Sequence, residues 1–493
     1  MAVNLNNPTE DDWQRSWLLN DSLFFTRYFF HEITGKRFII GNHHRLIADK
    51  LNQILTGEHP TNHLIINIAP RYGKTEIAVK NFIAAGLALN PKSRFIHLSY
   101  SGTLAQDNSI SIKNILNTDE YRRLFATRIK FGSDTKSRWD TEQGGGVYAT
   151  STLGQITGFG AGEVDDIDEN GNPKPYKFAG AIVIDDPIKP EDALSDVMRE
   201  NVNRRFETTI RNRVNSRNTP IIIIMQRLHE MDLCGYLQKL EPDVWDVLSL
   251  PCIQENQETG QSEPLWPFKH TMEELRKIEE ANSFVFDTQY MQNPTPLEGL
   301  MYQRFKTYET MPIEAHLPVK KNYTDTADTG ADFLCSICYD EFEQGMFVTD
   351  ILYTDKPMEY TEPETARMAD RAGTQEMLVE SNNGGRGFAR NVEKNLRSLG
   401  NKQCSVSWFT QTSNKLSRIF SHSAEVQNLI YFPVDWESRW PKFANAMKSC
   451  RKNGNNAHDD APDCCTGMCE NFQTFSAMTD DELDEMESII YDD

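Results

Sequence analysis

Apolar runs and helical stretches alternate along the first half of the chain. Five runs rich in β-branched residues have the length of buried strands: "HLIINIA" (63–69), "RFIHLSY" (94–100), "AGAIVID" (179–185), "PIIIIMQ" (220–226) and "VWDVLSL" (244–250). They are apolar on both faces and are separated by helical segments, which is typical of a parallel sheet covered by helices on both sides. The pattern therefore predicts an α/β domain with a mostly parallel sheet.

The pattern changes after the last of these runs. Thr271 and Glu274 form a capping box before the helical stretch "LRKIEEAN". The segment "QNPTPLEGL" has the composition of a linker, and a second strand-rich unit begins at "KNYTDTADTG". We predict a first domain of residues 1–295 with an N-terminal helical segment and a lid region near 255–295, a linker of 296–312, a second α/β domain of 313–476 and an acidic tail of 477–493.

Composition places the chain among globular proteins with more than one domain, because 493 residues exceed what a single core supports. The longest apolar run has about six residues, far fewer than the ~20 that a membrane span needs. The polar, acidic start "MAVNLNNPTEDDW" lacks the features of a signal or transit peptide. Nine scattered cysteines fit free thiols in a reducing cytosol. We therefore expect a cytoplasmic protein with no membrane partner.

The net charge of −21 is unevenly distributed. The tail carries eight acids and no Lys or Arg, which leaves −13 for the rest of the chain. A segment of this composition cannot bury enough apolar surface to fold alone. We expect the tail to be a disordered docking or regulatory arm, anchored on a partner through Ile489, Ile490 and Tyr491. A local basic face elsewhere could still bind DNA, since phosphate charge is felt over a Debye length of ~10 Å.

The segment "APRYGKTE" follows the first predicted strand and precedes the helical run "EIAVKNFIAAGLAL". This is the strand–loop–helix setting of a phosphate-binding loop. Backbone N–H groups at the helix start would hold the phosphates of ATP, and Gly73 would permit their close approach. Lys74 would reach the β and γ phosphates, and the Thr75 hydroxyl would bind Mg²⁺. Ile68 replaces the usual first glycine, and Pro70 can make the turn through its fixed φ.

Two later strands end in residues that would complete a nucleotide site. "AIVIDDP" ends in Asp185, expected to hold the metal, and Asp186, expected to polarise the attacking water. The second position is more often Glu, and Asp is one methylene shorter. In "MQRLHEMDL", Gln226 and Arg227 could sense the γ-phosphate, and Arg71 could stabilise transferring charge; either arginine could instead be structural. The predicted site consists of Arg71, Tyr72, Gly73, Lys74, Thr75, Asp185, Gln226 and Arg227 as nucleotide contacts, with Asp186 and Arg71 as catalytic residues.

The second unit has carboxylates at predicted strand ends and at a helix start. Asp325 ends one strand, and Glu380 ends another. Asp459, Asp460 and Asp463 stand at the mouth of a helix in "AHDDAPDCCTGM". Carboxylates in this arrangement can hold two divalent metals, Mg²⁺ or Mn²⁺, about 4 Å apart, and such a pair supports phosphodiester hydrolysis. Each acid taken singly is more often a cap or a surface group, so the prediction rests on their order and spacing.

A basic stripe lies beside these acids in the sequence. Its four cations recur at helical spacing and fall within one ~80° arc of a helix. Such a stripe could follow a phosphate backbone, or it could be a solvated helix face. Its members are Arg386, Arg390, Lys394 and Arg397.

An ATP site followed by a two-metal nuclease cluster is an uncommon order, and here the chain resembles the large subunit of tailed-bacteriophage terminases. The resemblance covers most of the chain. It rests on "APRYGKTE", "SYSGTLAQD", "ITGFGAG", "IVIDDPIKPEDA", "QRLHEMDLCG", "LWPF", "YMQNPTPLEG", "DTADTGAD" and "HDDAPD". It implies an ASCE-type P-loop ATPase domain and an RNase H-like nuclease domain.

The resemblance also implies roles and partners. Lys74, Thr75 and Asp185 match the nucleotide and Mg²⁺ positions of the family, and Asp186 stands where its catalytic acid stands. Gln226 replaces the common Thr at the family's coupling position. The implied partners are double-stranded DNA, a portal protein, a small terminase subunit and further copies in a ring on the procapsid, in the host bacterial cytoplasm. The nuclease acids match Asp325, Glu380 and one of Asp459 or Asp460.

We therefore predict ATP-driven translocation of duplex DNA into a procapsid, with metal-dependent endonuclease cuts at the start and end of packaging. One alternative is a helicase-like translocase fused to a repair nuclease, which would need strand-separating motifs where the chain instead moves into a linker. Another is a non-enzymatic capsid-docking protein with a degenerate ATPase, which the intact Lys74, Thr75 and acids argue against.

Overall fold

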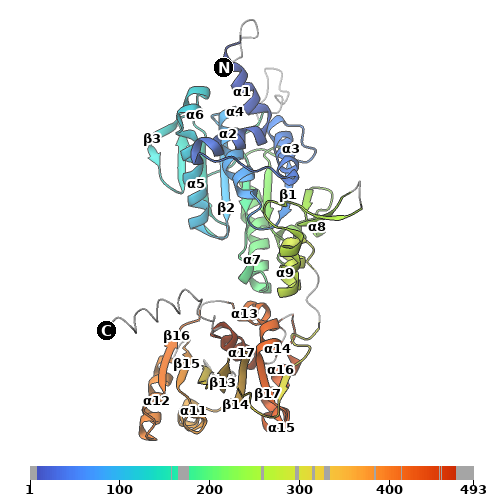
Figure 1. Cartoon of the computed structure of the whole chain (residues 1–493). Helices are drawn as coiled ribbons and strands as arrows, with labels where there is room; N and C mark the ends of the chain where they lie inside the picture. The colour runs from blue at the N-terminus through green and yellow to red at the C-terminus, as the bar shows by residue number, and fades with distance from the viewer. Residues whose placement is uncertain are drawn as a thin grey trace, which may run out of the picture. The chain divides into compact units, whose positions relative to one another are not determined.

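The computed structural model of the chain divides into two compact units, Met1–Pro296 and Leu297–Asp493 (Figure 1). It describes residues 8–156, 158–164, 177–256, 260–294, 299–313, 317–326, 333–381, 385–411, 414–452, 454, 456 and 458–472. The acidic tail of 477–493 lies outside the described residues. Both units are α/β, as predicted.

Within the described residues, the first unit has an eight-stranded sheet of order β3-β4-β5-β2-β6-β7-β1-β8. The six neighbouring strands β5, β2, β6, β7, β1 and β8 are parallel to one another. β3 and β4 are antiparallel strands added at the β5 edge. The strands are β1 (His63–Ile68), β2 (Arg94–Ser99), β3 (Ile129–Asp134), β4 (Arg138–Thr141), β5 (Gly146–Ser151), β6 (Ile182–Asp185), β7 (Ile221–Met225) and β8 (Asp246–Leu250), with a separate hairpin of β9 (Ile253–Glu255) and β10 (Ser262–Pro264).

Most helices of the first unit begin at a residue whose side chain caps the helix. Asp21 caps the second helix, and Thr271 and Glu274 make the predicted capping box of α9. The α-helices are α1 (Glu10–Asn20), α2 (Ser22–Thr34), α3 (Asn42–Thr56), α4 (Phe82–Leu89), α5 (Gly102–Leu116), α6 (Asp119–Leu124), α7 (Asp196–Arg205), α8 (Leu233–Leu240), α9 (Met272–Ala281) and α10 (Ser283–Val285). The π-helical segments are η1 (Glu76–Asn81), η3 (Phe206–Ile210) and η5 (Phe286–Tyr290), and the 3₁₀ segments are η2 (Pro190–Asp192) and η4 (Arg211–Arg213).

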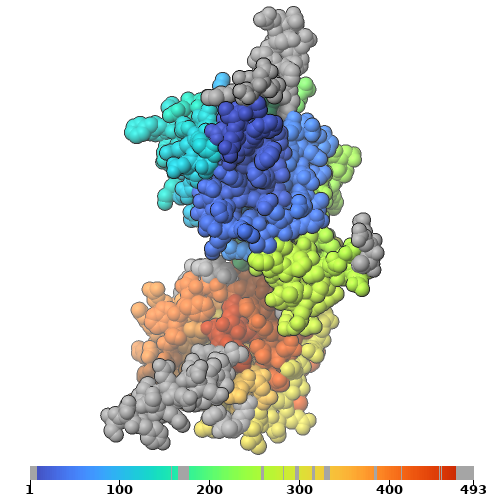
Figure 2. All heavy atoms as spheres, turned by 45° about the horizontal axis from the view of Figure 1, so that its top comes forward, coloured from blue at the N-terminus to red at the C-terminus, as the bar shows by residue number. Residues whose placement is uncertain are grey.

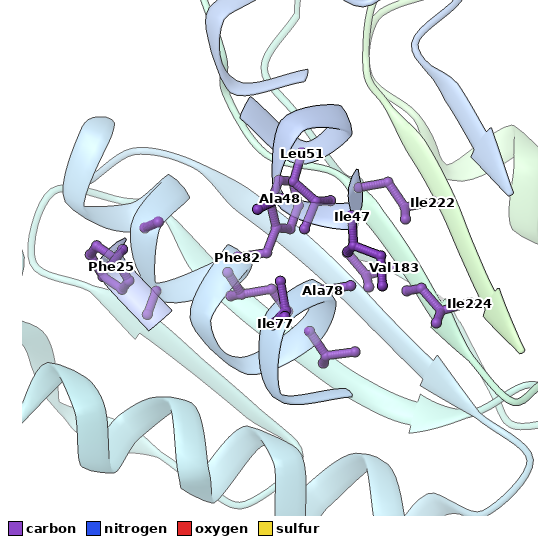
Figure 3. Packing of buried hydrophobic residues seen from close by; sticks show 14 of the residues in the cluster. Phe25, Ile47, Ala48, Leu51, Ile77, Ala78, Phe82, Val183, Ile222 and Ile224 are labelled. Atoms are coloured by element: carbon purple, nitrogen blue, oxygen red, sulfur yellow. The ribbon is translucent and has the colours of Figure 1, made fainter. Parts of the chain in front are cut away.

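Successive side chains of the central strands enter two separate cores, because a strand alternates its side chains between the faces of the sheet. Ile222 and Ile224 of β7 pack with Val183 under α2, α3 and η1, and Figure 3 shows Ile47 and Leu51 of α3 beside them. Ile221, Ile223 and Met225 of the same strand enter the opposite core, with α7 and α8. The five predicted strands are present as β1, β2, β6, β7 and β8. The first four are buried as predicted, whereas β8 lies at the edge of the sheet and only Leu250 is buried.

The second unit has a seven-stranded mixed sheet within the described residues, in the order β11-β17-β14-β13-β12-β15-β16. β12, β13 and β14 are antiparallel neighbours, whereas β12, β15 and β16 are parallel. The strands are β11 (Lys306–Tyr308), β12 (Val319–Asp325), β13 (Leu334–Phe342), β14 (Gly345–Thr354), β15 (Glu376–Glu380), β16 (Ser405–Phe409) and β17 (Ile430–Pro433).

Helices cover both faces of this sheet. α11 and α12 bury a core with β13 and β15 on one face, and α17 packs on β12 and β13. The helices are α11 (Met358–Ala372), α12 (Gly385–Ser398), α13 (Lys415–Ser421), α14 (Ser423–Leu429), α15 (Trp436–Arg439), α16 (Pro441–Ser449) and α17 (Asp460–Glu470). This strand order fits the RNase H-like class that was predicted.

The predicted linker of 296–312 needs a correction. Part of it belongs to the second unit, because β11 pairs with β17 at the sheet edge. Met301 and Tyr302 are buried, and the Phe305 ring packs 5.2 Å from the ring of Trp436. These apolar side chains add the segment to the second core.

Three properties of the whole chain also bear on its function. All nine cysteines are buried free thiols, in agreement with the expectation from their scattered positions. Among the described helices, none combines the length and the apolar character that crossing a bilayer requires. The sheets of both units end in carboxylates, which are described next.

Candidate functional site

Three strand ends of the first sheet bring the predicted nucleotide-site residues together. β1, β6 and β7 are parallel and in register, so the residues after them meet at one edge. Lys74 Nζ donates to Asp186 Oδ1 at 2.7 Å and to Gln226 Oε1 at 2.8 Å. Thr75 Oγ1 donates to Asp185 Oδ2 at 2.7 Å. The loop, the acidic pair and the end of β7 therefore form one polar cluster.

The Asp185 carboxyl is the buried acid of this cluster. Burial raises its pKa to about 7, with the charge of Asp186 adding to the effect, while Lys74 and the Thr75 hydroxyl oppose it. Its Oδ1 atom is buried and has no hydrogen-bond partner among the described residues. A buried carboxylate oxygen without a donor is costly unless a cation or a donor reaches it. The arrangement fits a divalent metal beside Asp185.

The backbone of Asp186 is strained. Its φ is 45°, a left-handed conformation that costs of order 1–3 kcal/mol and persists only when the surroundings fix it. Two neighbouring strands do so: the Asp186 N–H donates to the Ile224 carbonyl at 2.9 Å, and the Tyr100 N–H donates to the Asp186 carbonyl at 2.8 Å. This conformation accompanies the contact between the Asp186 side chain and Lys74.

Two buried histidines of α3 support the loop from beneath, and no motif in the sequence singles them out. His44 Nδ1 accepts from the Gly41 N–H at 2.9 Å, so its Nε2 carries the proton that it donates to the Tyr72 carbonyl at 3.1 Å. His43 Nε2 contacts the same carbonyl oxygen at 3.2 Å. A Cβ atom at Gly73, whose φ is +79°, would lie 2.6 Å from His44 Nε2. The glycine is thus required by both the backbone conformation and the histidine.

The two candidate arginines differ in their surroundings. Arg227 Nε pairs with the fully buried Asp232 carboxylate at 3.0 Å, and Arg227 Nη2 donates to two carbonyls of its own loop. This favours the structural alternative for Arg227. Arg71 is exposed, has a φ of 65°, and forms no ion pair with any described residue. Its catalytic role stays a prediction.

The second candidate site lies at the ends of β12 and β15, where Asp325 and Glu380 are paired in register. Tyr323, two residues before Asp325 on the same face of β12, donates its hydroxyl to Glu380 Oε2 at 2.9 Å. Asp460 and Asp463 lie in the first turn of α17 and are buried. The structure therefore brings together the strand acids and the helix acids.

Two cations of α13, not predicted from the sequence, lie among these acids. Lys415 Nζ is 2.8 Å from Asp460 Oδ1, 2.9 Å from Asp459 Oδ1 and 3.8 Å from Asp463 Oδ2. Arg418 Nη1 is 3.1 Å from Asp463 Oδ1 and 3.6 Å from Glu380 Oε2, and its Nη2 reaches Glu470. Their K-x-x-R spacing on one helical face was the only signal in the sequence.

The electrostatics of the second site are dominated by buried negative charge. Burial raises the pKa of Asp325 well above its usual value, and Asp463 adds to this. Burial also raises the pKa of Asp463 to about 7, against the opposing effect of Arg418 and Lys415. Burial lowers the pKa of Lys415, but the aspartates more than offset this and leave it above its usual value.

The oxygen donors of this cluster suit a hard divalent cation in kind. In the present arrangement, however, no group of three candidate ligands among the described residues is placed to hold a metal ion. Lys415 and Arg418 contact the oxygens that such an ion would need. Of the two adjacent acids left open by the sequence, Asp460 points inward and accepts from the Phe333 N–H at 3.1 Å, whereas the Asp459 side chain is 40% exposed.

The basic stripe forms one face of α12. Phe388, Val392 and Leu396 are buried on the opposite face. Arg397 is held by Glu393 at 3.2 Å, and the Arg390 guanidinium lies 5.8 Å from the Trp408 ring centroid. The exposed remainder of the stripe is available for phosphate contacts.

Comparison with models of known protein families gives no match, and no curated protein matches the chain. The solved structures that match include large terminases, the proteins that the sequence motifs resemble. The large terminase of a thermophilic bacteriophage is 11% identical with a TM-score of 0.48, over 86% of this chain and 98% of that one.

Two further terminases extend the comparison. The bacteriophage HK97 large terminase is 10% identical with a TM-score of 0.36, over 91% of this chain and 98% of that one. A human cytomegalovirus terminase nuclease domain is 11% identical with a TM-score of 0.26, over 34% and 90%. At identities this low and TM-scores below 0.5, these matches carry no argument about function, which has to follow from the residues of the two sites.

The buried histidines make the first unit sensitive to acid. Burial lowers the pKa of His44 to about 4 and that of His43 to about 3, against ~6.5 in an unfolded chain. Both are therefore neutral in the fold, and below pH ~6.5 the unfolded state binds more protons. We expect the free energy of unfolding to fall between pH ~6.5 and ~4 by about 1.4 kcal/mol per pH unit for each histidine.

His44→Gln, which keeps a donor for the Tyr72 carbonyl, should remove one histidine's share of this slope in chemical denaturation of the full chain at a series of pH values. His31→Gln, at an exposed histidine of α2, is the control. Equal slopes for the two variants would show that His44 does not titrate as described.

Proposed function

We propose that this protein is an ATP-driven motor that moves double-stranded viral DNA into a procapsid and cuts it at the start and end of packaging. One observation carries the proposal: a single chain holds two separate carboxylate centres at the ends of parallel strands, one built around Lys74 and Thr75 and one around Asp325 and Glu380. The first has the groups for nucleotide hydrolysis, and the second has the groups for phosphodiester hydrolysis.

In the first centre, residues of this chain would bind and orient ATP with its Mg²⁺. The backbone N–H groups of the loop and the start of η1 would hold the phosphates. Lys74, which pairs with Asp186 and Gln226, would exchange these partners for phosphate oxygens. Thr75 and Asp185 would hold Mg²⁺, which supplies charge neutralisation at the phosphates. Asp186 would then be free to orient a water molecule and accept its proton.

Gln226 would lose its hydrogen bond from Lys74 when Lys74 turns to the phosphate oxygens. It contacts Lys74 at the end of β7, and the next backbone N–H, that of Arg227, donates to Gln292 Oε1 at 3.0 Å. Gln292 is buried and has a φ of 57°, and it lies four residues before Pro296, the end of the first unit. A change at Lys74 therefore has a short bonded path to the segment that leads into the second unit.

In the second centre, Asp325, Glu380, Asp460 and Asp463 would hold divalent metal. The metal would supply activation of water and stabilisation of the leaving oxygen. Lys415 and Arg418 would need to leave the carboxylate oxygens that they now contact, and their charges would then be available for the DNA phosphates. Tyr323 would fix the orientation of the Glu380 carboxylate. The basic stripe of α12 would add phosphate contacts without reading sequence.

The remaining elements of the proposal concern partners. They are a portal protein, a small terminase subunit and further copies of the chain in a ring, at the portal vertex of the procapsid in the host bacterial cytoplasm. They follow from the motif resemblance, and packaging in a defined system with empty procapsids would test them.

Asp186→Asn should lower the rate of ATP hydrolysis by about 10²-fold or more, because the variant keeps the shape of the side chain but loses the base. The Kd for ATP should change far less. Lys74→Ala should abolish both binding and hydrolysis, and Glu191→Gln, at an exposed acid nearby, is the matched control. Single-turnover hydrolysis and equilibrium nucleotide binding are the measurements. Normal hydrolysis by Asp186→Asn would assign the base to another acid, with Glu76 and Glu230 the next to test.

Asp325→Ala should abolish DNA cleavage and leave ATP hydrolysis near the wild-type rate, since Asp325 belongs to the other unit. Cleavage of plasmid DNA with Mg²⁺ or Mn²⁺, and its arrest by EDTA, measure the first activity. Asp355→Ala, at an exposed acid of the second unit, should cut normally. Cleavage by Asp325→Ala at the wild-type rate would refute the nuclease assignment.

A further inference from the structure

The N-terminal helices of the first unit carry a surface groove that neither candidate site uses. It has a volume of about 430 Å³ and lies between α2 and the segment that follows it. The N-terminal segments appear in blue on the surface in Figure 2. The lining residues are Phe24, Arg27, Tyr28, His31, Arg37, Phe38, Ile39 and Ile40.

The walls of this groove are apolar and partly open to solvent. Ile39 is 42% exposed, and Trp17 of α1 is 63% exposed. The centroid of the Trp17 ring lies 6.4 Å from that of Phe24, in an edge-to-face arrangement. Exposed aromatic and aliphatic side chains gathered around a hollow are typical of a site that binds a partner. A peptide with a few apolar side chains fits a hollow of this size.

The rim of the groove is cationic. Arg27 and Arg37 are exposed, and neither guanidinium forms an ion pair with a carboxylate among the described residues. His31 faces Glu32 at 3.8 Å, and the Tyr28 hydroxyl donates to Glu120 Oε2 at 2.9 Å. Two arginines beside an apolar hollow favour a ligand that is both acidic and apolar. The carboxylates of such a ligand can pair with the guanidinium groups while its apolar side chains fill the hollow.

One segment of this chain has that chemistry. Residues 477–493 carry eight acids and no Lys or Arg, and the apolar run Ile489, Ile490 and Tyr491 lies between Glu487 and two terminal aspartates. The 21 residues after Phe472 can extend to about 70 Å. The apolar run matches the hollow, and the flanking carboxylates match the arginines.

We propose that the groove of α2 binds the acidic segment 477–493 of a second copy of the chain. Ile489, Ile490 and Tyr491 enter the hollow, and the neighbouring carboxylates pair with Arg27 and Arg37. Phe38 lines the groove and also packs on His44, which supports the nucleotide loop; the centroids of the two rings are 4.9 Å apart. The surface test therefore uses the two arginines and leaves Phe38 unchanged.

The test measures binding of a fluorescently labelled peptide of residues 477–493 to the full chain by anisotropy. The chain carries Ile489→Ala, Ile490→Ala and Tyr491→Ala, so that its own tail does not compete. We expect saturable binding that weakens as salt rises from about 0.05 to 0.5 M. Arg27→Glu with Arg37→Glu should weaken it by at least about tenfold.

The matched control is Lys92→Glu with Lys130→Glu, which makes the same change of charge at exposed lysines elsewhere on the first unit. It should bind the peptide as the parent chain does. A peptide with the three apolar residues changed to alanine should lose binding. The proposal is overturned if the wild-type peptide does not bind, or if the two charge-reversal proteins bind it equally.

Discussion

Each candidate site holds more carboxylates than cations, and the architecture of both sites follows from that constraint. In the first unit, Lys74 is shared by Asp186 and Gln226, while Asp185 keeps one oxygen without a donor. In the second, Lys415 and Arg418 stand among a larger set of acids. Removing charge from water is costly unless it is paired, so the fold must supply a cation to each cluster or leave a carboxyl with a raised pKa. Both outcomes are present: Asp185 has a raised pKa, and Lys415 and Arg418 contact the acids of the second cluster.

The scaffolds around the two clusters serve the same end by different means. Parallel strands in register bring the carboxylates to one edge, and packing beneath them limits their movement. His43 and His44 hold the Tyr72 carbonyl under the nucleotide loop. In the second unit, Tyr323 holds Glu380. Gly467 of α17 permits this, because a Cβ there would lie 2.1 Å from Tyr323 Cζ.

The sequence predicted the buried strands well because continuous β-branched runs have few other uses. It missed β3, β4 and β5, whose exposed or polar residues lack that pattern, as in "IKFGSD". The linker was drawn too long because proline and glycine mark its start, whereas the short strand β11 depends on a partner strand, β17, far along the chain. Local composition holds no information about such a pairing.

The same limit applies to the sites. A loop motif and two strand ends were enough to group Lys74, Thr75 and Asp185, because strand–loop–helix spacing encodes that geometry. The approach of Lys415 to Asp460 depends on how α13 packs on α17, which no spacing rule contains.

The central claim is that the second cluster exchanges its internal cations for metal. Electron paramagnetic resonance of Mn²⁺ with the nucleotide-free full chain tests it most directly, because bound and free Mn²⁺ are counted without any need for activity. We predict that the wild-type chain binds two ions that Asp325→Asn no longer holds, and that Lys74→Ala retains both. Equal Mn²⁺ binding by the wild-type chain and by Asp325→Asn, in number and in affinity, would contradict this account.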